Sequence, residues 1–158
     1  MARVDGVDEL FDREFARLAR ALALVFGAEA AADAVQEAFI AADRRWRTVS
    51  AYDDPAGWVR SVALNRLRNG RRDRRRREAI LATVRPVEPD DLTTELLDLR
   101  RALESLPERM RLCVCLHHVG GYPVAETAAL LGVTEGTVKS NLHDARLRLR
   151  ERLEERHG

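Results

Sequence analysis

Apolar residues recur at spacings of three and four positions through most of this chain of 158 residues. This spacing places them on one face of an α-helix, whereas a half-buried strand would need strict alternation. The first helix should end at Gly27, and the second runs through Trp46. Their apolar positions are Leu10, Phe11, Phe15, Leu18, Leu22 and Val25, then Val35, Phe39, Ala42 and Trp46. The sequence therefore predicts an all-α fold.

A third helix is predicted to begin at Pro55, because Asp54 can cap it and proline suits the first helical turn. The stretch before it, residues 48–54, predicts a loop. The first turns of this helix are apolar and the later ones are rich in arginine. Gly70 is expected to kink or fray it, since glycine is a poor helix former.

Residues 79–93 contain two prolines and an acidic cluster but no sustained periodicity, which predicts a flexible linker. Helical spacing resumes at Thr94 and continues almost to the end of the chain. We therefore expect two small helical domains, residues 8–78 and 94–156, joined by this linker. The sequence leaves open whether the two domains pack together or stay apart.

The C-terminal domain contains the pattern of a helix-turn-helix. Gly132 can supply the left-handed turn residue, and Thr134 can cap the helix that follows. In this motif the second helix lies in the major groove of DNA, with its N-terminal residues against the base edges. The outward-facing candidates on that helix are Thr137, Lys139, Ser140, Asn141, His143 and Arg146. A helical hairpin with a solvated polar face would show the same pattern, so this stretch alone does not decide between the two.

A basic block follows the start of the third helix. The net charge is only +1, yet residues 60–77 contain nine arginines, Arg60 among them, and one acid. A helix with this charge can follow a phosphate backbone, whereas a disordered basic tail would not continue a packed helix. Asn65 suits base contacts, and Tyr52 in the preceding loop can stack on an exposed base. The DNA-binding candidates here are Tyr52, Asn65, Arg66, Arg68, Arg71 and Arg72.

Other functional classes find little support in the sequence. Cys113 and Cys115 are too few for a disulfide framework, and with His117 and His118 they fall short of a convincing metal site. We interpret both cysteines as small core residues and expect neither metal nor cofactor. No Ser-His-Asp arrangement, P-loop or dinucleotide loop is present, so we expect no enzymatic activity.

The hydropathy pattern bears on location. No apolar run approaches the roughly 20 residues that span a bilayer, and no signal peptide is recognisable. We therefore expect a cytoplasmic protein without membrane insertion.

Four segments, in this order and spacing, resemble the group IV bacterial sigma factors, the extracytoplasmic-function (ECF) class that contains regions 2 and 4 only. The segments are ADAVQEAFIAADRRW (32–46), GWVRSVALNRLRNGRR (57–72), LESLPERMR (103–111) and VAETAALLGVTEGTVKS (124–140). The resemblance covers about residues 10–153 and is nearest to the short actinobacterial members.

The resemblance implies an alternative sigma factor that binds core RNA polymerase and directs initiation at specific promoters. It implies that the second helix docks on the β′ clamp helices through Asp33, Gln36 and Glu37, with the β flap as a further polymerase contact. The third helix and its preceding loop would open the −10 element, and the last helix would read the −35 element. A separate anti-sigma protein is the implied regulator, and no obligate homo-oligomer is expected.

The chain departs from the family pattern at several positions. Asn141 and Asp144 stand where members usually carry arginine, and an acid beside phosphates is repulsive, which predicts a weak or unusual −35 contact. Ala32 stands where glutamate is frequent, and Asn69 where aspartate is.

Two other interpretations remain open. A sigma-like decoy that sequesters an anti-sigma factor would tolerate Asp144 but has no need of the basic third helix. A plain helix-turn-helix regulator would leave the segment 32–46 unexplained.

Overall fold

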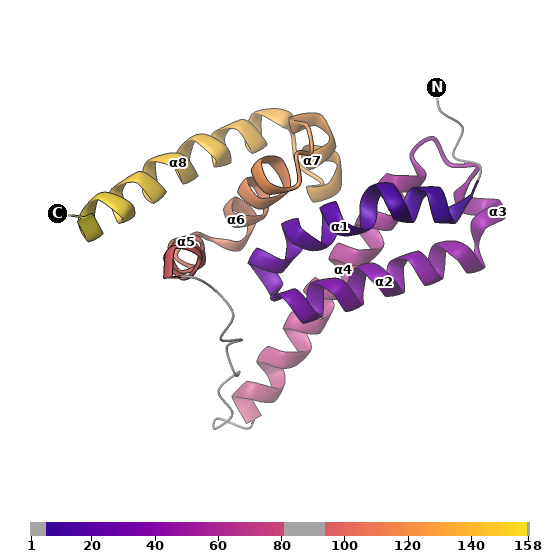
Figure 1. The fold of residues 1–158 in the computed structure, drawn as a ribbon, viewed down its shortest axis with the longest axis horizontal. Helices are drawn as coiled ribbons and strands as arrows, with labels where there is room; N and C mark the ends of the chain where they lie inside the picture. The colour runs from indigo at the N-terminus through magenta and orange to yellow at the C-terminus, as the bar shows by residue number, and fades with distance from the viewer. Residues whose placement is uncertain (1–5, 81–93, 158) are drawn as a thin grey trace.

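The computed structural model describes residues 6–80 and 94–157, with side chains described for residues 6–73 and 97–155 (Figure 1). Within these ranges the chain is helical and contains no strand, as predicted. The elements are α1 (Val7–Phe26), α2 (Ala28–Arg44), α3 (Trp46–Val49), α4 (Pro55–Ile80), α5 (Thr94–Glu104), α6 (Glu108–Val114), the π-helical turn η1 (Cys115–Val119), α7 (Val124–Leu131) and α8 (Glu135–His157).

Helices α1 to α4 form an N-terminal bundle. Helices α1 and α2 are an antiparallel pair, joined at Gly27, whose φ of 97° is a conformation that favours glycine. Helix α4 packs across this pair, so that apolar side chains of all three meet in one core. The predicted apolar faces are buried, or partly buried at Phe15 and Trp46, except at Phe11, which is exposed and contacts the rings of Phe15 and Phe39.

The approach to α4 differs from the prediction at its start. Residues 46–49 form the short helix α3, so the predicted loop is wrong at residues 48 and 49, because the fully buried Val49 fixes this turn against the core. The predicted cap is confirmed: the backbone N–H of Gly57 donates to Asp54 Oδ1 at 3.0 Å. The chain continues as one helix through Gly70 to Ile80, so no break occurs there and the predicted linker begins two residues too early.

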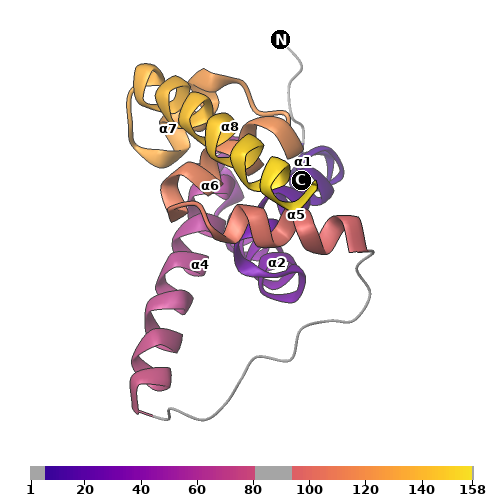
Figure 2. The same ribbon diagram turned by 90° about the vertical axis from the view of Figure 1, so that its left-hand side faces the viewer.

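Helices α5 to α8 and η1 form a C-terminal bundle, in which α8 passes over α5 (Figure 2). The sequence pattern predicts one α-helix over residues 108–119, but the last turn is π-helical, and the N–H of Gly120 donates to the carbonyl of Cys115 at 2.9 Å. A side chain at Gly120 would lie 2.8 Å from the ring of Tyr122, so only glycine fits. This turn places Tyr122 against the N-terminal bundle.

The two bundles pack against each other. Helix α1 contacts η1, α5 and α6, and α4 contacts α7. Buried residues from both bundles belong to one continuous apolar cluster, which includes Leu18 and Leu22 of α1 and Leu112 and Leu116 near η1. The question that the sequence left open, whether the domains pack together, is thus answered by a packed arrangement.

Candidate nucleic-acid interface

Helices α7 and α8 form the predicted helix-turn-helix. Gly132 adopts the left-handed conformation, with φ 67° and ψ 35°, and ends α7. The hydroxyl of Thr134 accepts a hydrogen bond from the N–H of Thr137 at 3.1 Å, which is the expected N-cap of α8. Val138 is fully buried and anchors the start of α8, so that the opposite face of its first turns points into solvent.

The six candidates on α8 are not equally available to a ligand. Lys139, Ser140, His143 and Arg146 are exposed, but two candidates are partly buried and bonded within the helix. The hydroxyl of Thr137 lies 2.9 Å from that of Thr134, and the amide of Asn141 donates to the carbonyl of Thr137 at 2.9 Å. Asp144 is exposed on the same helix, as the sequence suggested.

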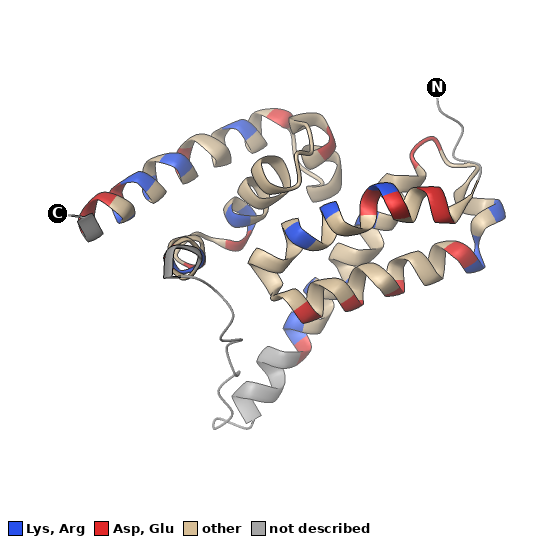
Figure 3. Cartoon of the chain, viewed as in Figure 1, with Lys and Arg blue, Asp and Glu red and all other residues tan. Residues whose placement is uncertain are grey.

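The charged residues are unevenly distributed over the helices (Figure 3). Lys and Arg follow α8 beyond the predicted set, since Arg148 and Arg150 are also exposed. On α4, Asn65, Arg66 and Arg72 are exposed and Arg68 is partly buried. Contact of these side chains with nucleic acid stays a prediction.

Among the described arginines of α4, Arg60 and Arg71 form ion pairs that reach the C-terminal bundle. Arg60 is only 5% exposed and lies in a buried ionic network, so its interpretation as a phosphate ligand is wrong for this arrangement. Arg71 forms an ion pair with Glu108 of α6 at 2.6 Å, and its guanidinium lies 5.1 Å from the centre of the Phe26 ring. Both residues therefore serve the packing of the chain in this structure.

A cleft of about 490 Å³ lies between α4 and α6. Its lining consists of Arg68, Arg71, Arg72, Glu108 and Arg109, which leaves an excess of positive charge. Sequence reasoning missed Arg109, because the pairing of these two helices depends on residues far apart in the chain.

Tyr52 is the predicted stacking residue. It lies in the loop between α3 and α4 with 44% of its surface exposed, unusually high for an aromatic side chain. Its position is compatible with stacking, which stays a prediction.

The outward face of α2 combines charge with an exposed apolar side chain. Asp33, Gln36 and Glu37 are exposed, and Figure 3 shows acidic residues spaced along this helix. Ile40, one turn after Gln36, is 45% exposed beside them. Glu37 forms an ion pair with Arg66 of α4, at a distance of 2.7 Å. Ile40 is thus an exposed apolar side chain on this face that the sequence analysis did not single out.

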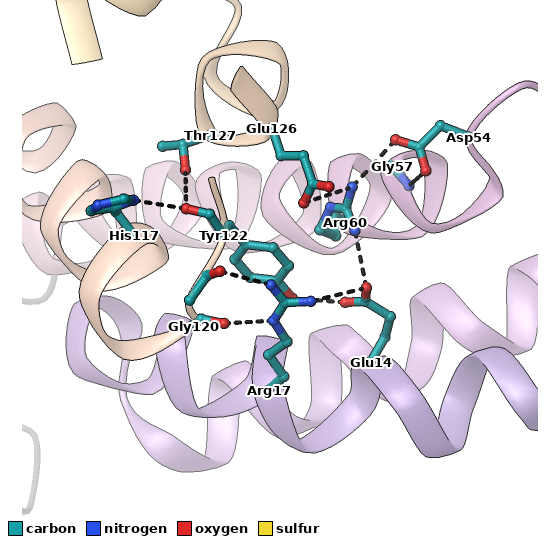
Figure 4. Close-up of polar contacts among 11 residues, drawn as sticks. Glu14, Arg17, Asp54, Gly57, Arg60, His117, Gly120, Tyr122, Glu126 and Thr127 are labelled. Atoms are coloured by element: carbon teal, nitrogen blue, oxygen red, sulfur yellow. Dashed lines mark hydrogen bonds and ion pairs between the residues drawn. The ribbon is translucent and has the colours of Figure 1, made fainter. Parts of the chain in front are cut away.

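A second charged cluster lies between the two bundles (Figure 4). The carboxylate of Glu14, which is 4% exposed, accepts hydrogen bonds from Arg60 at 3.1 Å and from the Tyr122 hydroxyl at 2.8 Å. Arg60 also lies 3.3 Å from Asp54 and 3.9 Å from Glu126. Burial, and then the negative charge of Glu14, raise the pKa of Tyr122 well above its ordinary value, so its hydroxyl remains a donor.

Arg17 completes this cluster. Its guanidinium donates to the carbonyls of Gly120 and Gly121 and lies 3.9 Å from the centre of the Tyr122 ring. No sequence signal indicated a role for Glu14, Arg17 or Tyr122.

The cysteines are core residues, as predicted. Cys113 and Cys115 are fully buried, and burial raises the pKa of both thiols, that of Cys115 to about 12. Among the residues that the structure describes, no group of three or more His, Cys, Asp or Glu side chains could hold a metal ion. In the same part of the chain, no helix is long and apolar enough to cross a membrane.

Comparison with known proteins finds sigma factors by both family model and sequence identity. Residues 96–149 match the family described as Sigma-70, region 4. The chain is 35% identical to the ECF RNA polymerase sigma factor SigM of Mycobacterium tuberculosis, over 90% of this chain and 74% of that protein. It is 32% identical to SigL of the same organism, over 98% and 97% of the two chains.

Two solved structures of other proteins resemble this chain over most of its length. The sigma factor RpoE in complex with the anti-sigma factor NepR from Bartonella quintana aligns with a TM-score of 0.73 and 25% identity, over 93% of this chain and 95% of that one. CnrH in complex with the cytosolic domain of CnrY aligns with a TM-score of 0.68 and 25% identity, over 94% and 87%.

Proposed function

Because the chain belongs to the family of ECF RNA polymerase sigma factors, we propose that it is an alternative sigma factor that binds core polymerase and directs initiation at specific promoters. The observation that carries this proposal is the presence of two separate candidate DNA-binding surfaces, on α4 and on α8, in one chain. Two surfaces can recognise two promoter elements, whereas a helix-turn-helix regulator needs only one. The N-terminal domain would end with α4 at Ile80, the C-terminal domain would span residues 94–156, and residues 81–93 would link them.

In this proposal α8 reads the −35 element in the major groove. Lys139, Ser140, His143 and Arg146 contact bases and phosphates directly, since all four are exposed. Thr137 and Asn141 contribute only after they leave the hydrogen bonds that they make within the helix turn. The negative charge of Asp144 weakens the contact.

The −10 element is opened and held by α4 and the loop before it. Asn65 and Tyr52 take the bases, and Arg66, Arg68, Arg71 and Arg72 hold the phosphates of the separated strand. Extrusion of a base from the duplex costs a few kcal/mol, which contacts of this kind offset. Arg60 has no part in this, because it supports the bundle from within.

The outward face of α2 docks on the β′ clamp helices of polymerase. Asp33, Gln36 and Glu37 provide the polar contacts, and we add Ile40 as the apolar one. The C-terminal bundle lies near the β flap. The resemblance to a sigma factor solved in complex with an anti-sigma factor supports an anti-sigma protein as the regulator of this chain. The protein acts in the cytoplasm as a monomer, without a cofactor and without enzymatic activity of its own.

The deciding experiment adds the purified chain to bacterial core RNA polymerase and measures holoenzyme formation, then transcripts from a genomic template library. A stable complex with discrete start sites is the expected result. Absence of any complex with core polymerase would overturn the proposal and favour the decoy or the plain regulator.

A further inference from the structure

We propose that Glu14, Arg60 and Asp54 form a positioning network that fixes the loop carrying Tyr52, and that the buried Arg60 thereby controls contact with the −10 element. This inference deepens the proposed function and rests on it, because it concerns the loop that we assigned to that element. Tyr52 touches the base, and the three network residues act only through the loop.

The loop, residues 50–54, is held at both of its ends. At the first end, Val49 is fully buried, and its carbonyl accepts a hydrogen bond from the N–H of Tyr52 at 3.1 Å. At the second end, Asp54 caps α4, where its side chain accepts the N–H of Gly57 at 3.0 Å. The exposed Tyr52 lies between these two anchors, so its position depends on both of them.

The second anchor is itself held by Arg60 (Figure 4). The side chain of Asp54 is 63% exposed, so water alone would leave its carboxylate free to turn. Its Oδ1 accepts the N–H of Gly57, and its Oδ2 lies 3.3 Å from the guanidinium of Arg60. Because each oxygen has a different partner, the orientation of the carboxylate is fixed as well as its location.

Glu14 fixes Arg60 in turn. The two groups are 3.1 Å apart, and both side chains are only 6% exposed, so each buried charge depends on the other. The planar guanidinium presents one nitrogen to Glu14 and another to Asp54, a geometry that a lysine cannot reproduce. Tyr122 and Glu126 of the C-terminal bundle also approach this network, but all three of its members belong to the N-terminal bundle.

Gly57 provides a second, independent observation. A Cβ at this position would lie 2.9 Å from Cγ of Asp54 and closer still to Oδ2, the oxygen that faces Arg60. Glycine is otherwise unfavourable within a helix. Its presence in the first turn of α4 thus leaves room for the carboxylate in the orientation that Arg60 requires.

The main test variant is Asp54→Asn. Asparagine is also a good N-cap, so this change keeps an oxygen for the N–H of Gly57 but removes the charge that pairs with Arg60. Asp53→Asn is the matched control, because Asp53 is the exposed neighbour and loses the same charge. Charge alone predicts that both changes tighten DNA binding, since each removes repulsion of phosphates. Positioning predicts that Asp54→Asn weakens it.

Two changes at Arg60 complete the set. Arg60→Lys keeps the positive charge beside Glu14 but loses the fork that also reaches Asp54. Arg60→Gln alone leaves Glu14 without its nearest cation and endangers folding, so it is combined with Glu14→Gln, which leaves no buried charge. Arg20→Gln, which removes an exposed arginine of α1, is the control for both.

The first measurement is hydrogen exchange in the free full-length chain. The amides of Tyr52 and Gly57 should exchange faster in Asp54→Asn, in Arg60→Lys and in the double variant, and at the parent rate in both controls. Unchanged exchange at these amides would overturn the positioning network. This measurement needs neither polymerase nor DNA.

The second measurement uses the chain bound to core polymerase and a single-stranded oligonucleotide that carries the −10 sequence from the start sites mapped above. The network variants should bind it more weakly, by at most the loss in Tyr52→Ala, which is roughly five- to a hundredfold for one stacked base. In the Tyr52→Ala background, Asp54→Asn should cause no further loss, because both act through the same contact. Affinity for core polymerase should not change.

A purely structural ion pair would behave differently. Losses that add in full to that of Tyr52→Ala, an equal loss of polymerase affinity, or matching results for Asp54→Asn and Asp53→Asn would each overturn the proposal. If the parent chain fails to bind core polymerase while loop exchange still responds to the variants, the proposed function is wrong and the network still positions the loop.

Discussion

Arg66 of α4 and Glu37 of α2 are joined by an ion pair of 2.7 Å that connects the proposed −10 surface with the proposed polymerase-docking surface. Both side chains are about half exposed, so the pair contributes less than about 1 kcal/mol to folding. In the proposed function, this pair would connect the residues that bind polymerase with those that contact the −10 element.

Glu37→Gln should leave the folding stability within about 0.5 kcal/mol of the parent chain, since surface substitutions rarely do more. It should weaken the complex with core polymerase, because the docking face loses a charge. Thermal unfolding and polymerase titration measure the two effects. Glu29→Gln, an exposed change at the start of the same helix, serves as control. Equal polymerase affinities for the two variants would remove Glu37 from the docking surface.

Lys139→Ala should reduce discrimination between the −35 sequence and unrelated duplex by about 1 to 3 kcal/mol, if Lys139 contacts a base. Affinity for core polymerase should not change, because Lys139 lies on α8 and the proposed polymerase-docking residues lie on α2. Competition binding on short duplexes measures the first effect. A parallel drop in polymerase affinity would show that α8 has been misassigned.

Asp144→Asn should tighten binding to the −35 duplex, most strongly at low salt, because the exposed carboxylate repels nearby phosphates. The salt dependence of the dissociation constant is the measurement. If the affinity falls instead, the carboxylate accepts a hydrogen bond from a base, and Asp144 belongs to the reading surface.

Arg72→Gln should weaken promoter opening and lower the salt slope by about 0.7 for each phosphate of the single strand that is no longer neutralised. Arg72 is the better probe than Arg71, since it is exposed and a change at Arg71 also breaks the ion pair with Glu108. The slope is measured on a forked promoter fragment, with Arg20→Gln as the control. An unchanged slope would mean that Arg72 contacts no phosphate.

The buried thiol of Cys115 should make the folded chain less stable at alkaline pH. Its pKa rises from 9.0 in the ordinary environment to about 12 in the folded chain, because burial disfavours the thiolate. The unfolded state therefore loses its proton first, and the folded state is progressively destabilised as the pH rises from about 9 toward 12. Below about pH 9 this thiol leaves the stability independent of pH. Cys115→Ala should flatten the decline in denaturant unfolding curves, and a decline of the same steepness would contradict the assignment.

Much of the fold follows from residues only a few positions apart. The apolar face of α1, the Asp54 cap of α4, the left-handed Gly132 and the Thr134 cap of α8 each depend on local spacing and backbone preference, and all are predictable from the sequence. Two differences from the predicted helices also have local causes. Val49 lies in a helical turn where a loop was predicted. The π-helical turn that begins at Cys115 could not be predicted, because it does not alter the periodicity of apolar residues.

The sequence by itself determined the helices, the helix-turn-helix and which residues carry charge. Only the tertiary structure decided which of those charges face solvent. Arg60 and Arg72 look alike in the sequence, but one is buried against Glu14, 46 residues away, and the other is exposed. Tyr122 reaches Glu14 across 108 residues. Such pairs arise because packing selects partners by position in space, and no local pattern records that position.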